Sequence, residues 1–206
     1  MTKILKETLV GSILGDAHIG WGSTSFNKAF ISFEQSSKKE GYLKFLHELI
    51  KKGGIPLMFE GVKSYSREDS RYNVKNNSLY FRTQSIEELR PLAEMFLDEK
   101  GKKFIPSRIA DELTYRSLAF WIMDDGQQVK RGGVTLCTDS YEPKEILTLQ
   151  EALKTNFNLE TTLHYKKSKR GDLYERIYIP KLGLDEIRPE IYPHFHESML
   201  YKINNF

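Results

Sequence analysis

The chain has 206 residues, a length that allows one large domain or two small ones. Its 39% hydrophobic and 12% aromatic residues can build a core, which excludes a disordered protein, and no apolar run is long enough to cross a membrane. The single cysteine, Cys137, excludes an internal disulfide and a cysteine-based zinc cluster, and a formal charge of +3 does not by itself indicate nucleic acid.

The elements predicted in chain order form two similar series. Each series opens with an apolar run of helical length, continues with alternating strand patterns and an amphipathic helix, and ends with a long hairpin and an acidic helix start. The ranges are 9–15, 26–36, 40–52 and 57–64 with 76–84 in the first series, and 118–124, 129–140, 143–157 and 159–167 with 173–180 in the second. This order predicts an α+β fold of two αββαββα halves, each with an antiparallel four-stranded sheet, at 1–105 and 106–206.

The strongest match between the halves is a short motif. "LVGSILGDAHIG" begins at Leu9 and "LAFWIMDDGQQV" begins at Leu118, and in both the eighth residue is an aspartate, Asp16 or Asp125. A helix C-terminus already carries partial negative charge, so a carboxylate there calls for a compensating cation. A buried helix that ends at a glycine, with solvated aspartates, would explain one motif alone. The repeat favours a cation site.

Two such motifs in one chain resemble the LAGLIDADG homing endonucleases, in their single-chain, two-motif branch. The resemblance implies that the motif helices pack side by side at the centre and that the sheets form a saddle in the DNA major groove. It also implies that Asp16 and Asp125 are catalytic metal ligands, with the carbonyls of Gly15 and Asp124 as further ligands. Hard oxygen ligands suit Mg²⁺, for which Mn²⁺ is expected to substitute. The second motif departs from the pattern, with Phe120 where glycine is expected and Asp124 where alanine is usual.

The same resemblance assigns three supporting catalytic residues. Lys103 in "KKFIP" and Lys202 in "MLYKIN" match the active-site lysines of the family, which polarise water or stabilise developing charge. Glu34 matches a strand position beside the catalytic centre. The alternative for both lysines is a solvated surface position.

Strand alternation predicts which side chains face DNA. Apolar residues such as Ile31 and Val134 point inward, which leaves polar and basic residues on the opposite face. The predicted groove-facing residues are Lys28, Ser32, Tyr80, Arg82, Arg131, Thr135, Arg176 and Tyr178. The second hairpin tip adds Lys166, Lys167, Lys169 and Arg170, which are expected to contact phosphates. An ordinary solvated sheet face is the alternative.

Together with these features, the resemblance implies a monomeric, metal-dependent homing endonuclease that cuts both strands of a long double-stranded DNA target, an intron insertion site. Two alternatives stay open: an RNA maturase that binds its intron RNA, and a non-catalytic DNA-binding regulator of the same fold. Loss of a motif aspartate would favour either one, and both aspartates are present. No membrane association and no targeting signal are predicted, and the gene is expected in an organelle or a prokaryote.

Overall fold

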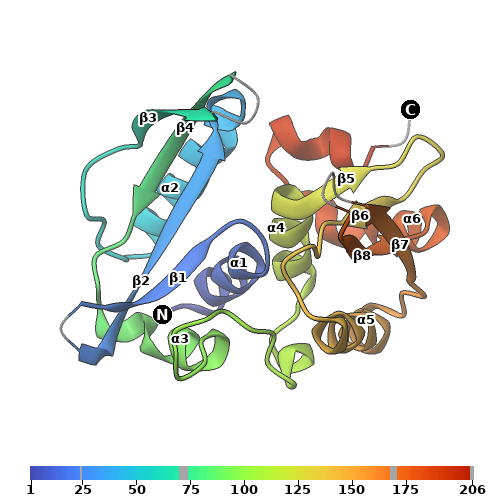
Figure 1. Ribbon diagram of the computed structural model, residues 1–206, viewed down its shortest axis with the longest axis horizontal. Coiled ribbons are helices and arrows are strands. Elements are labelled where there is room, and N and C mark those ends of the chain that lie inside the picture. Colours follow the sequence, from blue (N-terminus) through green and yellow to red (C-terminus); the bar gives the residue numbers. More distant parts are fainter. Residues whose placement is uncertain (24, 70–73, 168–170, 205–206) are drawn as a thin grey trace. The chain divides into compact units, whose positions relative to one another are not determined.

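The chain forms two antiparallel sheets of four strands each. The computed structural model describes residues 1–23, 25–69, 74–167 and 171–204. The first sheet has the strand order β1-β2-β4-β3 and the second has the equivalent order β5-β6-β8-β7 (Figure 1). The strands are β1 (His18–Gly22), β2 (Ser25–Ser36), β3 (Lys63–Asp69), β4 (Val74–Arg82), β5 (Gly126–Gln128), β6 (Val134–Leu136), β7 (Thr162–Lys167) and β8 (Leu173–Ile179).

The described residues also form six α-helices, which flank successive pairs of strands. They are α1 (Lys3–Leu14), α2 (Glu40–Lys52), α3 (Arg90–Phe96), α4 (Tyr115–Asp125), α5 (Pro143–Phe157) and α6 (Lys181–Ile191). Each half of the chain thus runs helix, two strands, helix, two strands, helix, which confirms the predicted α+β fold and its αββαββα order. Across the described ranges, no helix combines the length and the apolar character that a membrane crossing needs.

Contacts along the chain divide it into two compact units. The first unit comprises residues 1–6 and 16–102, and the second comprises residues 7–15 and 103–206. Most of α1 therefore packs with elements from the second half of the sequence. The division at 105 that the repeat suggests stays a prediction.

In each unit, one face of the sheet is buried against helices. Ile31 and Phe33 of β2 and Phe81 of β4 are buried in the first unit, where β2 and β4 contact α2. In the second unit Val134 and Leu136 of β6 are buried, and β6 contacts α4. Side chains that alternate with these residues lie on the other face of each sheet, as the sequence pattern predicts.

The structure differs from the predicted strand bounds: β1 and β5 lie before the predicted ranges 26–36 and 129–140, and β3 and β6 differ as well. β3 is found at Lys63–Asp69 instead of 57–64, and Leu57 forms only an isolated bridge with Thr83. β6 has only three residues, although the alternating pattern covers 129–140. Gly132 and Gly133, both at positive φ, form the turn directly before β6, and this backbone conformation cannot continue a strand.

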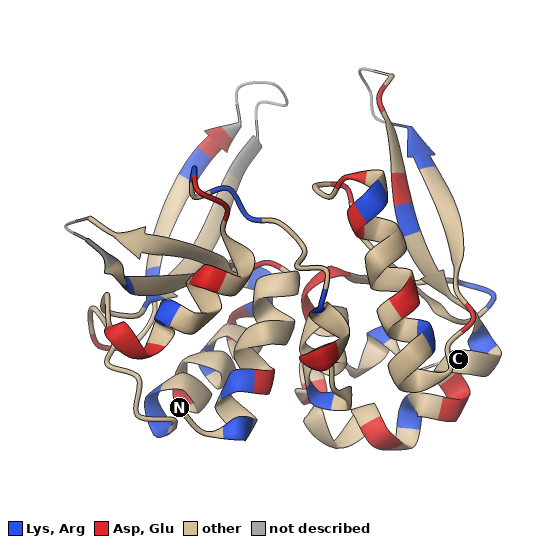
Figure 2. Cartoon of the chain, turned by 90° about the horizontal axis from the view of Figure 1, so that it is seen from below, with Lys and Arg blue, Asp and Glu red and all other residues tan. Residues whose placement is uncertain are grey.

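The β7–β8 hairpin of the second unit carries basic side chains near its tip. Lys166 and Lys167 are exposed at the end of β7, where basic residues colour the strand (Figure 2). Lys169 and Arg170, which the sequence analysis also assigned to this tip, lie outside the described residues.

Candidate active site and nucleic-acid interface

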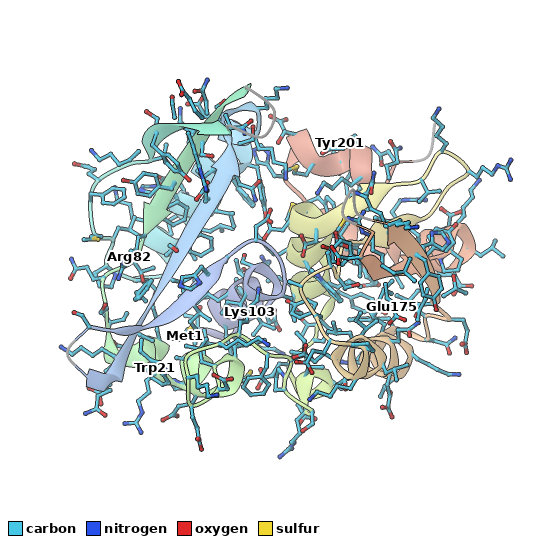
Figure 3. The ribbon with its side chains drawn as sticks, in the orientation of Figure 1. Met1, Trp21, Arg82, Lys103, Glu175 and Tyr201 are labelled. Carbon is cyan, nitrogen blue, oxygen red and sulfur yellow. The ribbon has the colours of Figure 1, made fainter. Side chains whose placement is uncertain are left out.

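Each motif helix ends against the ammonium group of a lysine. Lys103 Nζ donates to the carbonyl oxygens of Ile13, at 2.8 Å, and Gly15, at 3.4 Å, at the end of α1. Lys103 is labelled in Figure 3. The last carbonyls of a helix have no partner within the helix and carry its partial negative charge, so a cation there is stabilising.

Lys202, which corresponds to Lys103 in the repeat, binds the carbonyl groups at the end of α4. Its Nζ donates to the carbonyl oxygens of Ile122, Met123 and Asp124, two of them at 3.2 and 3.0 Å. An ammonium group has three N–H donors, so these bonds use all of them. Lys202 is only 4% exposed, whereas Lys103 is half-buried. The protein therefore provides a cation of its own, a lysine ammonium group, at the end of each motif helix.

The motif aspartates occupy different surroundings. Asp16 is exposed in the first unit, where one carboxylate oxygen accepts a hydrogen bond of 2.8 Å from Gln35 Nε2. Asp125 is half-buried as the last residue of α4, and its carbonyl accepts from the backbone N–H of Cys137 at 3.1 Å. Its neighbour Asp124 is 7% exposed.

Tyr141 is a residue of the second unit that the sequence analysis did not single out. Its hydroxyl donates to the carbonyl of Leu14 at 2.7 Å, and Lys103 Nζ lies 5.6 Å from the centre of its ring. Burial raises the pKa of the Tyr141 phenol far above its ordinary value, and the nearby negative charges of Asp125 and Glu145 raise it further. Tyr141 therefore stays a neutral hydrogen-bond donor to the end of α1.

Glycines allow α1 to approach α4 within the second unit. A Cβ added at Gly11 would lie 2.2 Å from the carbonyl oxygen of Ser117, and one at Gly15 would lie 2.5 Å from Asp124 Cβ. The close approach predicted for the motif helices is thus achieved with Phe120 in α4, because the glycines of α1 leave the space.

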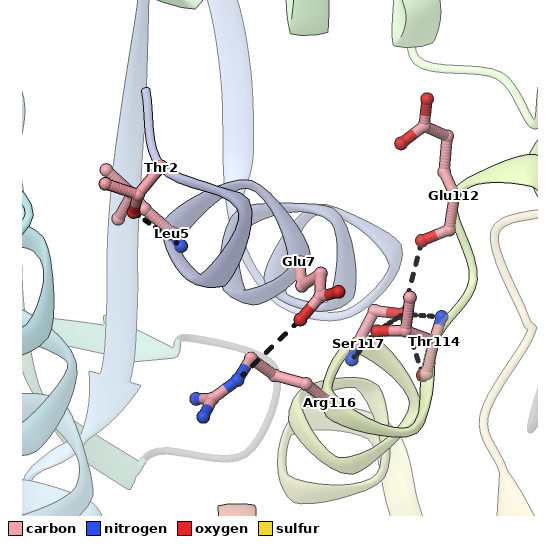
Figure 4. Close-up of polar contacts among 7 residues, drawn as sticks. All are labelled: Thr2, Leu5, Glu7, Glu112, Thr114, Arg116 and Ser117. Carbon is pink, nitrogen blue, oxygen red and sulfur yellow. Dashed lines mark hydrogen bonds and ion pairs between the residues drawn. The ribbon is translucent and has the colours of Figure 1, made fainter.

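Polar contacts at the start of α4 accompany this approach (Figure 4). Thr114 caps the helix in a capping box with Ser117, and Arg116 Nε lies 3.9 Å from a carboxylate oxygen of Glu7 on α1. A side-chain oxygen that accepts from a free N–H of the first turn fixes where the helix begins.

We expect Gly11→Ala to lower the free energy of unfolding by about 1–3 kcal/mol, because its methyl group would overlap a backbone carbonyl that cannot move alone. Gly183→Ala in α6 is the matched control, since its methyl would meet only the flexible end of Leu159. Denaturant titration of both variants measures the difference. Equal stabilities would contradict the tight approach of α1 to α4.

The helix ends offer a limited set of metal ligands. Within the described ranges, no group of three His, Cys, Asp or Glu side chains is placed to hold a metal ion. A divalent ion would therefore be bound by one or two carboxylates, with carbonyls, water and substrate phosphate as its other ligands. This ligand set is usual for Mg²⁺ in proteins. The carbonyls of Gly15 and Asp124 already accept from lysines, but a carbonyl oxygen has two lone pairs. The oxygen-only donor set fits such an ion.

The outer face of the first sheet carries five of the predicted residues. Ser32 lies opposite Arg82 in the β2–β4 pair, and Glu34 lies opposite Tyr80. Lys28 is exposed farther along β2. Glu34 accepts a hydrogen bond from the Tyr65 hydroxyl, which raises the pKa of Tyr65.

Two of the residues of the second sheet that were predicted to face DNA are buried. Thr135 and Arg176 are each 7% exposed. Arg176 donates through Nε and Nη2 to both carboxylate oxygens of Asp139, the first at 2.6 Å, and through Nη1 to Gln127 at 3.2 Å. Neither partner was identified from the sequence, because both lie about 40 to 50 positions away along the chain.

The remaining predicted residues of the second sheet are partly exposed. Tyr178 is half-buried, its ring stacks on that of His164 with 4.3 Å between centres, and its hydroxyl donates to the carbonyl of Gly132. Arg131 is exposed in the turn before β6. Lys166 shares a face with Arg176, whereas Lys167 pairs with Leu173 and lies on the opposite face.

Comparison with known proteins identifies relatives along the whole chain. The model of the LAGLIDADG DNA endonuclease family matches residues 6–186. The chain is 28% identical to DNA endonuclease I-ChuI of Chlamydomonas applanata, over 100% of this chain and 96% of that protein. It is 27% identical to cytochrome b mRNA maturase bI2 of Debaryomyces hansenii, over 100% of this chain and 76% of that protein.

Solved structures share the fold. The homing endonuclease I-WcaI, bound to its DNA recognition sequence, matches with a TM-score of 0.83 at 24% identity, over 100% of this chain and 88% of that one. I-DmoI in complex with DNA and Mn matches with a TM-score of 0.50 at 12% identity, over 98% and 96%. Since the family model covers both motifs, this chain belongs to the LAGLIDADG DNA endonuclease family, in its single-chain, two-motif branch.

Proposed function

We propose that this protein is a homing endonuclease that hydrolyses both strands of a long double-stranded DNA target, an intron insertion site, with the help of a divalent metal. The observation that carries the proposal is the repeated helix end. A motif aspartate lies at the end of both helices, Asp16 two residues after α1 and Asp125 as the last residue of α4, and at both ends a lysine ammonium group binds the final carbonyls.

In this proposal the aspartates hold the metal. Asp16 and Asp125 provide carboxylate ligands, and the carbonyls of Gly15 and Asp124 are further candidates, with Mg²⁺ as the expected ion and Mn²⁺ as a substitute. When bound, such an ion neutralises charge on the phosphate and lowers the pKa of a coordinated water. The structure of I-DmoI with DNA and Mn supports the use of a divalent ion in proteins of this fold.

The lysines and Glu34 have separate proposed roles. Lys103 is half-buried and is the better candidate to stabilise charge that develops on the phosphate. The ammonium group of Lys202 already donates hydrogen bonds to three carbonyl groups. We therefore assign Lys202 to stabilising the end of α4. Glu34 is exposed on the outer face of β2 and accepts from Tyr65, and we propose that it orients water beside the catalytic centre.

The outer faces of the two sheets are the proposed DNA-binding surfaces. Side chains on them can contact base edges in the major groove, and the hairpin tips can contact phosphates. The residues concerned are Lys28, Ser32, Tyr80, Arg82, Arg131, Thr135, Arg176, Tyr178, Lys166, Lys167, Lys169 and Arg170. Because one chain carries both motifs, we propose that a monomer binds the site. An organelle or prokaryotic genome is the proposed origin.

RNA splicing is the second candidate function, and a maturase relative that aligns over the entire chain favours it. Binding to intron RNA would use the same basic charge. A maturase role alone would not require both motif aspartates, which this chain retains. A non-catalytic regulator is disfavoured for the same reason.

A cleavage assay in different metals tests the proposal. The protein is incubated with a plasmid that carries its own insertion locus without the intron, in Mg²⁺, Mn²⁺, Ca²⁺ or EDTA. We expect linear plasmid with Mg²⁺ and Mn²⁺, and binding with little cutting in Ca²⁺, which is a larger ion and a poorer activator of water. Cleavage in EDTA would contradict metal dependence, and splicing of the intron RNA without any DNA cleavage would favour the maturase.

A further inference from the structure

The guanidinium group of Arg82, in the first unit, lies over an aromatic ring. It sits on β4, labelled in Figure 3, and its Cζ atom lies 3.4 Å from the centre of the Phe30 ring on β2. Arg82 pairs with Ser32, so its side chain reaches diagonally along the same face of the sheet to Phe30. A planar guanidinium group stacks well on a ring face, which restricts its orientation.

The ring of Phe30 is itself held in place. Its partner in the β1–β2 pair is Gly20, and a Cβ added at Gly20 would lie 2.8 Å from Phe30 Cζ and 3.0 Å from Cε1. The ring therefore occupies the space that any other residue at position 20 would fill. The His18 ring lies 5.9 Å from it at a tilt of 52°.

The guanidinium group of Arg82 differs from that of Arg176 in its polar contacts. Arg82 Nε is buried and has no hydrogen-bond partner among the residues that the structure describes. Arg176, on the repeat-related strand β8, instead pairs with both carboxylate oxygens of Asp139. A guanidinium group fixed by stacking, without a carboxylate, can offer two parallel N–H groups to the O6 and N7 acceptors of guanine.

We propose that Phe30 is a positioning residue for Arg82, and that Arg82 held in this way recognises a guanine of the DNA target through the major groove. This inference rests on the proposed function of the outer sheet face. The ring fixes the plane of the guanidinium group before DNA arrives, so recognition does not require the side chain to become ordered on binding.

Binding measurements across single-base variants of the target, in Ca²⁺ and at several salt concentrations, test this inference. Arg82→Ala should reduce discrimination at one guanine by about tenfold to a hundredfold. Phe30→Leu keeps an apolar side chain but removes the stacking surface, and we expect it to reduce discrimination at the same base pair with an unchanged salt dependence. Lys166→Ala in the β7–β8 hairpin, a residue proposed to contact phosphates, should instead weaken binding to all variants alike and flatten the salt dependence.

Gly20→Ala provides a second route, because it displaces the Phe30 ring without removing it. We expect Gly20→Ala to reduce discrimination at the same base pair. If Phe30→Leu fails to fold, the Gly20→Ala result tests the positioning role of Phe30 instead. Full discrimination by both folded variants would overturn the positioning role. A uniform, salt-dependent loss in Arg82→Ala would assign Arg82 to a phosphate. If the wild-type protein shows no preference for any DNA site, the proposed function itself fails.

Discussion

Asp16→Asn and Asp125→Asn should each lower double-strand cleavage by roughly two to three orders of magnitude or more, the loss typical when one electrostatic group leaves an active site. Asparagine has the shape of aspartate but lacks the charge that binds a metal ion. At position 16 it can still accept the hydrogen bond from Gln35, so the local structure should persist. Binding to the target in Ca²⁺ should change little, because neither carboxylate is proposed to contact a base.

The control is Asp111→Asn, which removes an exposed carboxylate of the second unit that pairs with Arg108 on the surface. Gel analysis of supercoiled, nicked and linear plasmid separates the outcomes for the three variants. A nicked product from one motif variant would show that each aspartate serves one strand. Full linearisation by either motif variant in Mg²⁺ would remove the aspartates from the proposed catalytic centre.

Lys202→Met should destabilise the protein by about 2–4 kcal/mol, because three carbonyl groups in a buried site lose a charged hydrogen-bond donor. Lys103→Met should cost about 1 kcal/mol, since that lysine is half-buried and water can replace part of its contacts. The methionine side chain fills similar space, so the comparison isolates the ammonium group.

Lys144→Met on α5 serves as the surface control. Lys144 is highly exposed and pairs with Glu142 at 3.2 Å, a type of contact worth about 0–1 kcal/mol. Denaturant unfolding of the three variants gives their order of stability. A Lys202→Met protein with unchanged stability and lost cleavage would assign Lys202 to catalysis alone.

The order of elements was predictable from the sequence because helical and strand periodicities differ and because the pattern occurs twice. The bounds were less accurate where local backbone conformation decides. Gly132 and Gly133 shorten β6 despite an alternating pattern, and the polar stretch of β3 has no apolar alternation to mark it.

The candidate site was predictable in its residue types but not in its contacts. The motifs locate the helix ends, whereas the acceptors of Lys103 and Lys202 lie about 80 to 90 positions away along the chain. Alternation predicts the face of Arg176 but does not reveal that Asp139 binds it. No local pattern marks Tyr141, whose partner Leu14 is 127 positions away.

The grouping of residues 7–15 with 103–206 bears on how such a chain could arise by duplication. A polypeptide that contained only the second repeat would lack the segment of α1 that packs with it, in which Leu9, Val10 and Ile13 are buried. An ancestor with a single repeat would therefore need a second copy of itself to supply that helix. Fusion of two genes would supply that helix segment from within one chain, after which the two copies could diverge.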